Sequence, residues 1–170
     1  MRVLVSDASI LIELAKWSLL EALFKLPFEF AVPDALYEDE LIDLGEIDRE
    51  RLKELGLRVE SLDAEGMARA ISYQTAQPKL TLHDCLAVTL AVKNDWPLLT
   101  GDKRMRALAI DEHLDVHGVL WVIDRFAEYR IVRKPALAKA LRGMLDDPRT
   151  RLPHSEIHRR LEVLIGKTGG

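Results

Sequence analysis

One stretch of this chain, from Thr81 to Met105, constrains its fold more than any other. Its first part, from Leu82 to Val92, is apolar on almost every side of a helix, which is typical of a helix buried in a core. An Asn-Asp-Trp-Pro sequence ends that helix, and the apolar residues that follow predict a short buried strand. Two acids stand in this stretch: Asp84 in the first helical turn, and Asp102 just past the strand. Because acids are rarely buried without a partner or a metal, both are candidates for a functional site.

Strand-like and helix-like segments alternate along the chain. The predicted strands are residues 2–6, 28–32, 57–62, 97–100 and 114–117. The predicted helices are residues 10–17, 19–26, 33–44, 47–55, 63–76, 82–92, a helix opening at 101–102, 119–129, 135–145 and 155–165. This alternation predicts an α/β fold, a three-layer α/β/α sandwich with a mainly parallel central sheet, plus helices at the C-terminal end.

Two of the acids directly follow predicted strands, Asp7 after the first and Asp102 after the fourth. The carboxyl ends of parallel strands share one edge of a sheet, and binding sites form there. We therefore expect Asp7 and Asp102 to meet, with Asp84 beside them, although they are far apart in sequence.

A further acid is expected from the predicted helix at residues 33–44, which carries Glu38, Asp39 and Glu40 in a row. At 100° per residue, Glu40 falls among the leucines of the apolar face, Glu38 lies at its edge, and Asp39 points away. An acid on the inward face of a helix needs a partner. Glu40 is therefore our first choice for the site, and Glu38 the second.

The predicted cluster is Asp7, Glu40, Asp84 and Asp102. Four carboxylates at close range repel one another unless a cation neutralises them. Sites made only of oxygen ligands suit Mg²⁺ or Mn²⁺, and such a site activates water and stabilises the charge of a reacting phosphodiester.

Each aspartate also has a purely structural interpretation as a helix cap. Asp7 or Ser9 can cap the first helix of the chain, and Asp102 can cap the helix that opens at residues 101–102. Thr81 and Asp84 have the spacing of a capping box, although Glu or Gln is usual at the second position.

These acids, in this order, resemble the motifs of the PIN-domain nucleases, a family that includes the toxin ribonucleases of bacterial toxin–antitoxin pairs. The matching segments are the first strand with Asp7-Ala8-Ser9, Val32-Pro33 leading to Glu40-Leu41, Leu82 to Ala87, and Leu98 to Asp102. The resemblance implies a Mg²⁺-dependent endonuclease, usually acting on RNA, in which these four acids bind the metal and Thr100 orients a ligand or water.

The C-terminal part is similar to the tail of a less characterised PIN subgroup, through His117-Gly118-Val119-Leu120 and two further helices. We expect a PIN-like nuclease domain at residues 1–125 and a helical extension at 126–170 packed on it. The expected partners are an RNA substrate, an antitoxin protein and a second copy of the chain in a homodimer.

Two alternative functions remain open at this point. One is a catalytically degenerate PIN fold used for binding, against which the complete set of four acids argues. The other is a phosphoryl-transfer α/β protein, which needs an acceptor aspartate and a nearby lysine. Neither Lys93 nor Lys103 is well placed for that role.

The charge is distributed unevenly. Residues 1–124 have a net charge of −10 and residues 125–170 one of +6, and a basic segment on an acidic body is typical of a polyanion-binding face or of a solvated helical surface. Lys103, Arg104 and Arg106 directly follow the fourth acid, where they are expected to hold RNA phosphates beside the metal.

The chain carries no sequence signal for a membrane. It begins with a strand-like run instead of a signal peptide, and no apolar run reaches the ~18 residues of a membrane span. We expect a soluble, cytoplasmic protein with no membrane partner.

Overall fold

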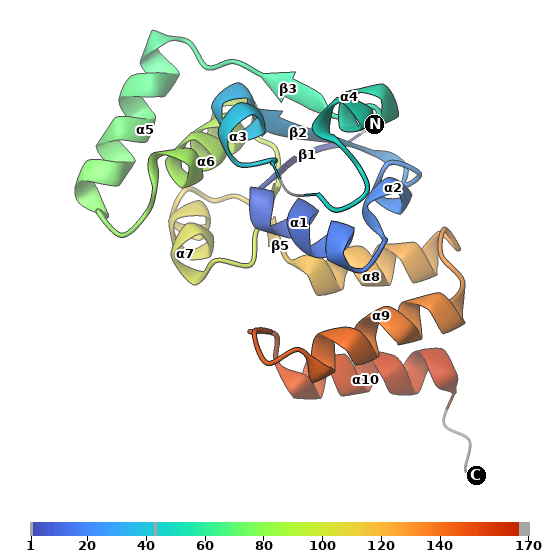
Figure 1. Ribbon diagram of the computed structural model, residues 1–170. Helices are drawn as coiled ribbons and strands as arrows, with labels where there is room; N and C mark the ends of the chain where they lie inside the picture. Colours follow the sequence, from blue (N-terminus) through green and yellow to red (C-terminus); the bar gives the residue numbers. More distant parts are fainter. Residues whose placement is uncertain (1, 43, 167–170) are drawn as a thin grey trace. The chain divides into compact units, whose positions relative to one another are not determined.

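The computed structural model describes residues 2–42 and 44–166, and divides the chain into two compact units, one up to Val119 and one from Leu120 (Figure 1). The strands are β1 (Arg2–Ser6), β2 (Phe28–Pro33), β3 (Arg58–Glu60), β4 (Leu98–Leu99) and β5 (Val116–His117). The helices are α1 (Ala8–Lys16), α2 (Leu20–Leu23), α3 (Asp34–Asp39), α4 (Arg49–Leu55), α5 (Ala64–Ala76), α6 (Leu82–Asn94), α7 (Lys103–Asp111), α8 (Val119–Glu128), α9 (Lys134–Asp146) and α10 (His154–Ile165).

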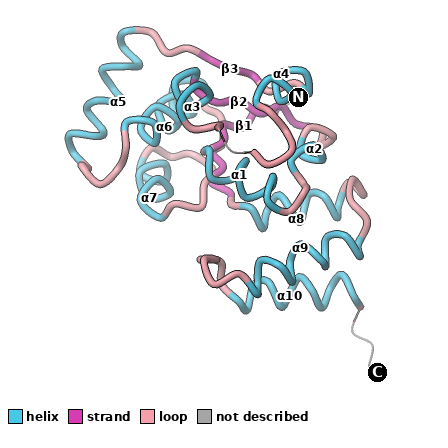
Figure 2. The backbone as a smooth tube through the Cα atoms, in the orientation of Figure 1, coloured by secondary structure: helices cyan, strands magenta, loops and turns pink. Residues whose placement is uncertain are grey.

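The five strands form one parallel sheet in the order β3-β2-β1-β4-β5. Figure 2 shows the strands in magenta, with β1, β2 and β3 side by side. The predicted fold class, an α/β sandwich with a parallel central sheet and further helices at the C-terminal end, is confirmed. From β1 the chain builds outward through β2 and β3 on one side, and then through β4 and β5 on the other. The order of the sheet therefore reverses between β1 and β4, and such a switch point is where open α/β sheets place their binding sites.

Helix α6 is the centre of the first unit. It packs on β1, β2 and β4, while α5, α3 and α7 pack on α6. Every residue from Cys85 to Ala91 is buried, which confirms a helix buried on nearly all sides. Thr81 caps its start, because the Thr81 hydroxyl accepts from the Asp84 N–H and the Asp84 carboxylate accepts from the Thr81 N–H.

The second unit contains α9 and α10 packed against each other, with buried apolar residues on both. Arg160 on α10 donates two hydrogen bonds to the carboxylate of Asp124 on α8, at 2.8 and 2.9 Å, and another to Glu156. Among the described residues, no helix combines the length and the apolar character that crossing a membrane requires.

One helix is shorter than its sequence pattern predicts. The apolar pattern suggests a helix from Pro33 to Leu44, but α3 ends at Asp39. The early end of α3 is explained by Arg49, ten residues after Asp39. The Arg49 guanidinium donates to the carbonyl oxygens of Tyr37 and Glu38 at 3.4 and 2.7 Å. These bonds satisfy carbonyls that a longer helix would have used internally. Leu41, in the turn that follows, and Leu44, beyond that turn, are still buried, as the pattern requires.

Candidate active site

Asp7 lies at the switch point of the sheet, directly after β1. Its N–H donates to the carbonyl of Leu99 at the end of β4, so the first residue past β1 stands beside the end of β4. The Asp7 side chain is 6% exposed. Its Oδ2 accepts hydrogen bonds from the hydroxyls of Ser9, at 2.8 Å, and Thr100, at 3.0 Å. These two hydroxyls fix the orientation of the carboxylate.

Burial raises the pKa of the Asp7 carboxyl group above its ordinary value. The hydrogen bonds from Ser9 and Thr100 oppose that shift, because they favour the ionised form, while the negative charge of Asp84 adds to it. A cation bound near both carboxylates would stabilise the ionised form of Asp7, because it would offset both the burial and the repulsion from Asp84.

Thr100 connects Asp7 to Asp102. The Thr100 hydroxyl donates to Asp7 Oδ2 and accepts the backbone N–H of Asp102 at 3.1 Å. Asp102 in turn begins α7, because its Oδ1 accepts the N–H groups of Arg104 and Met105 at 2.8 and 2.9 Å. A fully buried threonine therefore sets the relative positions of two of the four predicted acids.

The three consecutive acids after α3 have different surroundings. Glu38 lies 3.4 Å from Arg49 Nη2 and its side chain is 60% exposed. Asp39 pairs with His83 Nε2 at 2.8 Å. Glu40 is 30% exposed, and its Oε1 lies 3.3 Å from His83 Nδ1.

Of these three, Glu40 is the acid whose charge interacts with the buried aspartates. Burial raises the pKa of the Glu40 carboxyl group, His83 opposes that rise, and the charges of Asp7 and Asp84 increase it. Asp7, Glu40 and Asp84 therefore lie close enough to interact electrostatically, and Thr100 ties Asp102 to the first of them. The metal-ligand roles of the four acids remain predictions.

The oxygen atoms of this set suit a hard divalent cation. Within the described part of the chain, Oε2 of Glu40, Oδ1 of Asp84 and Oδ2 of Asp102 accept no hydrogen bond. Carboxylate oxygens with free lone pairs are the ligands that Mg²⁺ and Mn²⁺ prefer. The side chains do not form a complete metal-binding site in this structure. Residues 2–42 and 44–166 contain no group of three or more His, Cys, Asp or Glu side chains close enough together to hold a metal ion.

The interpretation of the aspartates as capping residues is confirmed. Asp7 caps α1, Asp84 closes the capping box of α6, and Asp102 caps α7. Capping by Asp84 and Asp102 occupies one carboxylate oxygen in each and leaves the other unbonded within the described residues. A structural role and a ligand role are therefore compatible in the same side chain.

The basic residues predicted to hold phosphates lie on the first turns of α7. Lys103, Arg104 and Arg106 are exposed, and their side chains form no ion pair with another described residue. A Cβ built on Gly118 would lie 3.7 Å from the Thr100 carbonyl oxygen and 3.8 Å from Arg106 Nη2. The Arg106 guanidinium therefore lies near the same edge of the sheet as the acids.

His83 is a site residue that the sequence interpretation missed. It contacts both Asp39 and Glu40, yet in the sequence it is only a polar interruption of an apolar helix. The one available signal was its position directly before Asp84, in the first turn of the predicted core helix.

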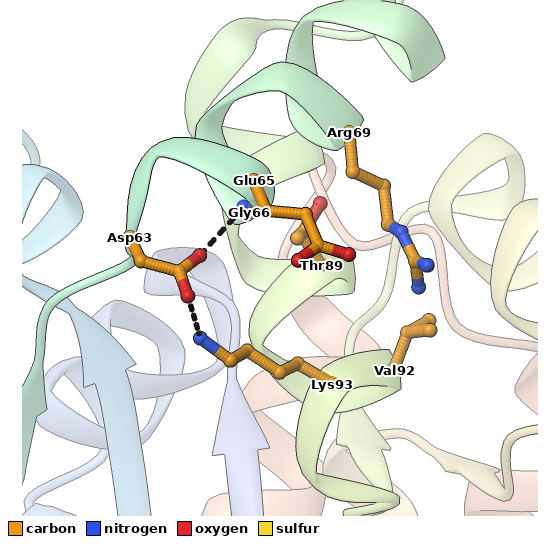
Figure 3. A pocket seen from close by; sticks show the side chains of 7 residues that line it. All are labelled: Asp63, Glu65, Gly66, Arg69, Thr89, Val92 and Lys93. Atoms are coloured by element: carbon orange, nitrogen blue, oxygen red, sulfur yellow. Dashed lines mark hydrogen bonds and ion pairs between the residues drawn. The ribbon is translucent and has the colours of Figure 1, made fainter.

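A cavity of about 250 Å³ lies away from these acids, between α5 and α6 (Figure 3). Asp63 and Lys93, joined by a 2.9 Å ion pair, form one side of it, and Glu65 and Arg69 line it as well. None of the predicted site residues lines this cavity.

Comparison with known families gives one match over most of the chain. A family model described as a PIN domain matches residues 3–165, which includes both compact units. No curated protein matches the chain.

Proposed function

The chain belongs to the PIN-domain family, whose members are generally metal-dependent nucleases, and we propose that it is an endoribonuclease that hydrolyses phosphodiester bonds of RNA with Mg²⁺ or Mn²⁺. The observation that carries the proposal is the hydrogen-bonded chain from Asp7 through Thr100 to Asp102 at the switch point of the sheet. The electrostatic interaction of Asp7 with Glu40 and Asp84 supports it.

The proposed roles follow from the surroundings of each side chain. Asp7, Glu40, Asp84 and Asp102 would hold the metal, which when bound supplies an activated water and stabilises the charge of the phosphodiester. Thr100 fixes the spacing between Asp7 and Asp102 through its single hydroxyl. That hydroxyl and the one on Ser9 hold the Asp7 carboxylate in one orientation, so little reorganisation is needed on binding.

RNA is the proposed substrate because exposed cations flank the acids. Lys103, Arg104 and Arg106 lie on the helix that Asp102 caps, and they are free to contact phosphates. They would bind the RNA backbone without reading bases, since phosphate contacts carry no sequence information.

The nuclease proposal is tested by titrating Mg²⁺ and Mn²⁺ into a cleavage assay on fluorescent single-stranded RNA and DNA. We expect metal-dependent cleavage of RNA, and a loss of about 100-fold or more in Asp7→Asn and Asp102→Asn, because losing even a supporting residue costs metal sites about 10–100-fold. Asp95→Asn is the matched control, an exposed acid at the far end of α6. No cleavage by the parent chain, with normal folding, would favour the degenerate PIN fold instead.

The choice between the consecutive acids is tested by calorimetry with Mn²⁺. We expect Glu40→Gln to weaken Mn²⁺ binding and Glu38→Gln to leave it unchanged, because Glu38 is paired with Arg49 and Glu40 is not. The opposite order would assign the ligand role to Glu38.

The basic C-terminal segment is proposed to add to RNA binding. Arg130, Arg133 and Lys134 are exposed and form no ion pair within the described residues. Changing all three to Ala should reduce the slope of log K against log salt for binding of single-stranded RNA by about 2, since each lost phosphate contact lowers that slope by about 0.7. An unchanged slope would show that these side chains do not contact RNA, and Mn²⁺ affinity should not change in either case.

The toxin role implied by the resemblance is proposed as well. Induced expression of the parent chain should arrest bacterial growth, and Asp7→Asn should not. An antitoxin encoded in the neighbouring open reading frame should restore growth when it is expressed together with the parent. Unimpaired growth under expression of an active nuclease would separate this chain from the toxins.

A further inference from the structure

His83 lies between two carboxylates from another helix. It is the second residue of α6, and its imidazole faces the end of α3. Nε2 lies 2.8 Å from Asp39 Oδ2, and Nδ1 lies 3.3 Å from Glu40 Oε1. Both ring nitrogens are therefore turned toward acids, one at the last residue of α3 and one at its C-cap.

This placement is not explained by the local preferences of α6. The first turn of a helix favours negative groups, so a histidine that pairs with carboxylates gains little there from α6 itself. Its neighbour Asp84 satisfies that preference through the capping box. What His83 adds is a connection between α6 and α3, two helices that pack on each other.

We propose that His83 is a positioning residue, which holds the Glu40 carboxylate beside Asp7 and Asp84 through Nδ1 and is itself oriented by Asp39 through Nε2. The inference rests on the proposed function, because it assigns His83 a role toward the metal ligands. It does not make His83 a ligand or a proton carrier.

Glu40 needs such a residue more than the other three acids do. Asp7 and Asp102 are the N-caps of α1 and α7, and Asp84 closes the capping box of α6, so backbone N–H groups or neighbouring hydroxyls fix these three carboxylates. Glu40 follows the C-terminal end of α3, where the helix offers carbonyl oxygens, and no N–H group of the described residues binds its carboxylate. His83 supplies the contact that the backbone cannot.

The test uses three substitutions of His83 that separate its two contacts. In His83→Asn the amide nitrogen reaches about as far as Nδ1, so the contact with Glu40 is kept and that with Asp39 is lost. In His83→Gln the amide nitrogen reaches about as far as Nε2, so the contact with Asp39 is kept and that with Glu40 is lost. His83→Ala removes both contacts. His158→Asn, a change in an exposed histidine of α10, is the control.

The readouts are Mn²⁺ affinity by calorimetry, kcat and KM for RNA cleavage, and circular dichroism for folding. Supporting residues around metal ligands are worth about 10–100-fold in affinity or activity, so we expect His83→Ala and His83→Gln to lose about 10-fold in Mn²⁺ affinity and in kcat. We expect KM for RNA to be unchanged, and His83→Asn and His158→Asn to stay within about 3-fold of the parent.

Two results would overturn the proposal. If His83→Gln were normal and His83→Asn impaired, the contact with Asp39 would be the one that matters, and His83 would serve as an interhelical tie. If all three variants bound Mn²⁺ like the parent, Glu40 would need no positioning. Both results presuppose a parent chain that binds metal and cleaves RNA; a parent chain that does neither contradicts the proposed function itself.

Discussion

The metal-free protein is expected to become more stable when its most buried acid loses its charge. The substitution is Asp7→Asn, studied in EDTA so that no divalent cation is present. Burial and the charge of Asp84 raise the pKa of the Asp7 carboxyl group in the folded chain, which means that ionised Asp7 disfavours folding. An amide of the same shape removes that unfavourable charge.

The magnitude follows from two opposing contributions. Each unit of raised pKa corresponds to about 1.4 kcal/mol against the ionised folded state. The Asn oxygen can still accept the hydroxyls of Ser9 and Thr100, which both donate to Oδ2. What is lost is the long 3.4 Å bond from the Ser9 N–H to Oδ1, and the new amide N–H groups bring a small desolvation cost. We expect a net gain of about 1 kcal/mol in the free energy of unfolding at pH 7.5.

The pH dependence provides the sharper check. Because the folded pKa of Asp7 lies above the unfolded value, the parent loses stability as the pH rises from about 4 through the folded pKa. The advantage of Asp7→Asn should therefore be small near pH 4 and complete at pH 7.5. Urea denaturation at several pH values measures it, with Asp95→Asn as an exposed control. A variant that is less stable than the parent at pH 7.5, with no growth of the difference between pH 4 and 7.5, would refute the reasoning.

Three further outcomes are expected from substitution or chemical labelling of other side chains. Thr100→Val should lower the free energy of unfolding by about 2 kcal/mol, because Asp7 loses a donor and the Asp102 N–H loses its acceptor, whereas Thr100→Ser should stay near the parent in urea denaturation. Burial raises the pKa of the Cys85 thiol to about 11, so the native protein should resist iodoacetamide at pH 8 and react only in urea, and rapid native labelling would contradict its burial. Arg160→Ala should cost about 1–2 kcal/mol in the same denaturation assay, since the bidentate bond to the α8 carboxylate is lost, and an unchanged midpoint would show that this pair contributes nothing.

The strands and helix starts of this chain could be read from its sequence because their causes are local. Short apolar runs predicted all five strands within a few residues, and capping residues such as Thr81 and Asp102 marked where helices begin. The end of α3 could not be predicted, since Arg49 determines it from a distant segment. The preference for Glu40 over Glu38 rests on a helical wheel that assumes a helix to Leu44, whereas α3 ends at Asp39. The wheel therefore does not describe the position of Glu40. Glu38 and Glu40 differ because Glu38 pairs with Arg49 and Glu40 lies beside His83. The spacing of apolar residues in the sequence does not predict either contact.

Three of the four acids lie at the starts of helices, which offset part of their mutual repulsion. Helices α1, α6 and α7 begin at or beside Asp7, Asp84 and Asp102, and the partial positive charge of a helix N-terminus stabilises a carboxylate there. Capping therefore lowers the cost of collecting negative charge before any cation binds, and it fixes the direction of each side chain. Glu40 lies at the opposite, negative end of a helix, where this benefit is absent. Among the described residues, the side chain that pairs with Glu40 is His83, so the acid with the least backbone support has a side-chain nitrogen beside it. Removing His83 should therefore disturb Glu40 and leave the three aspartates at the helix starts in place.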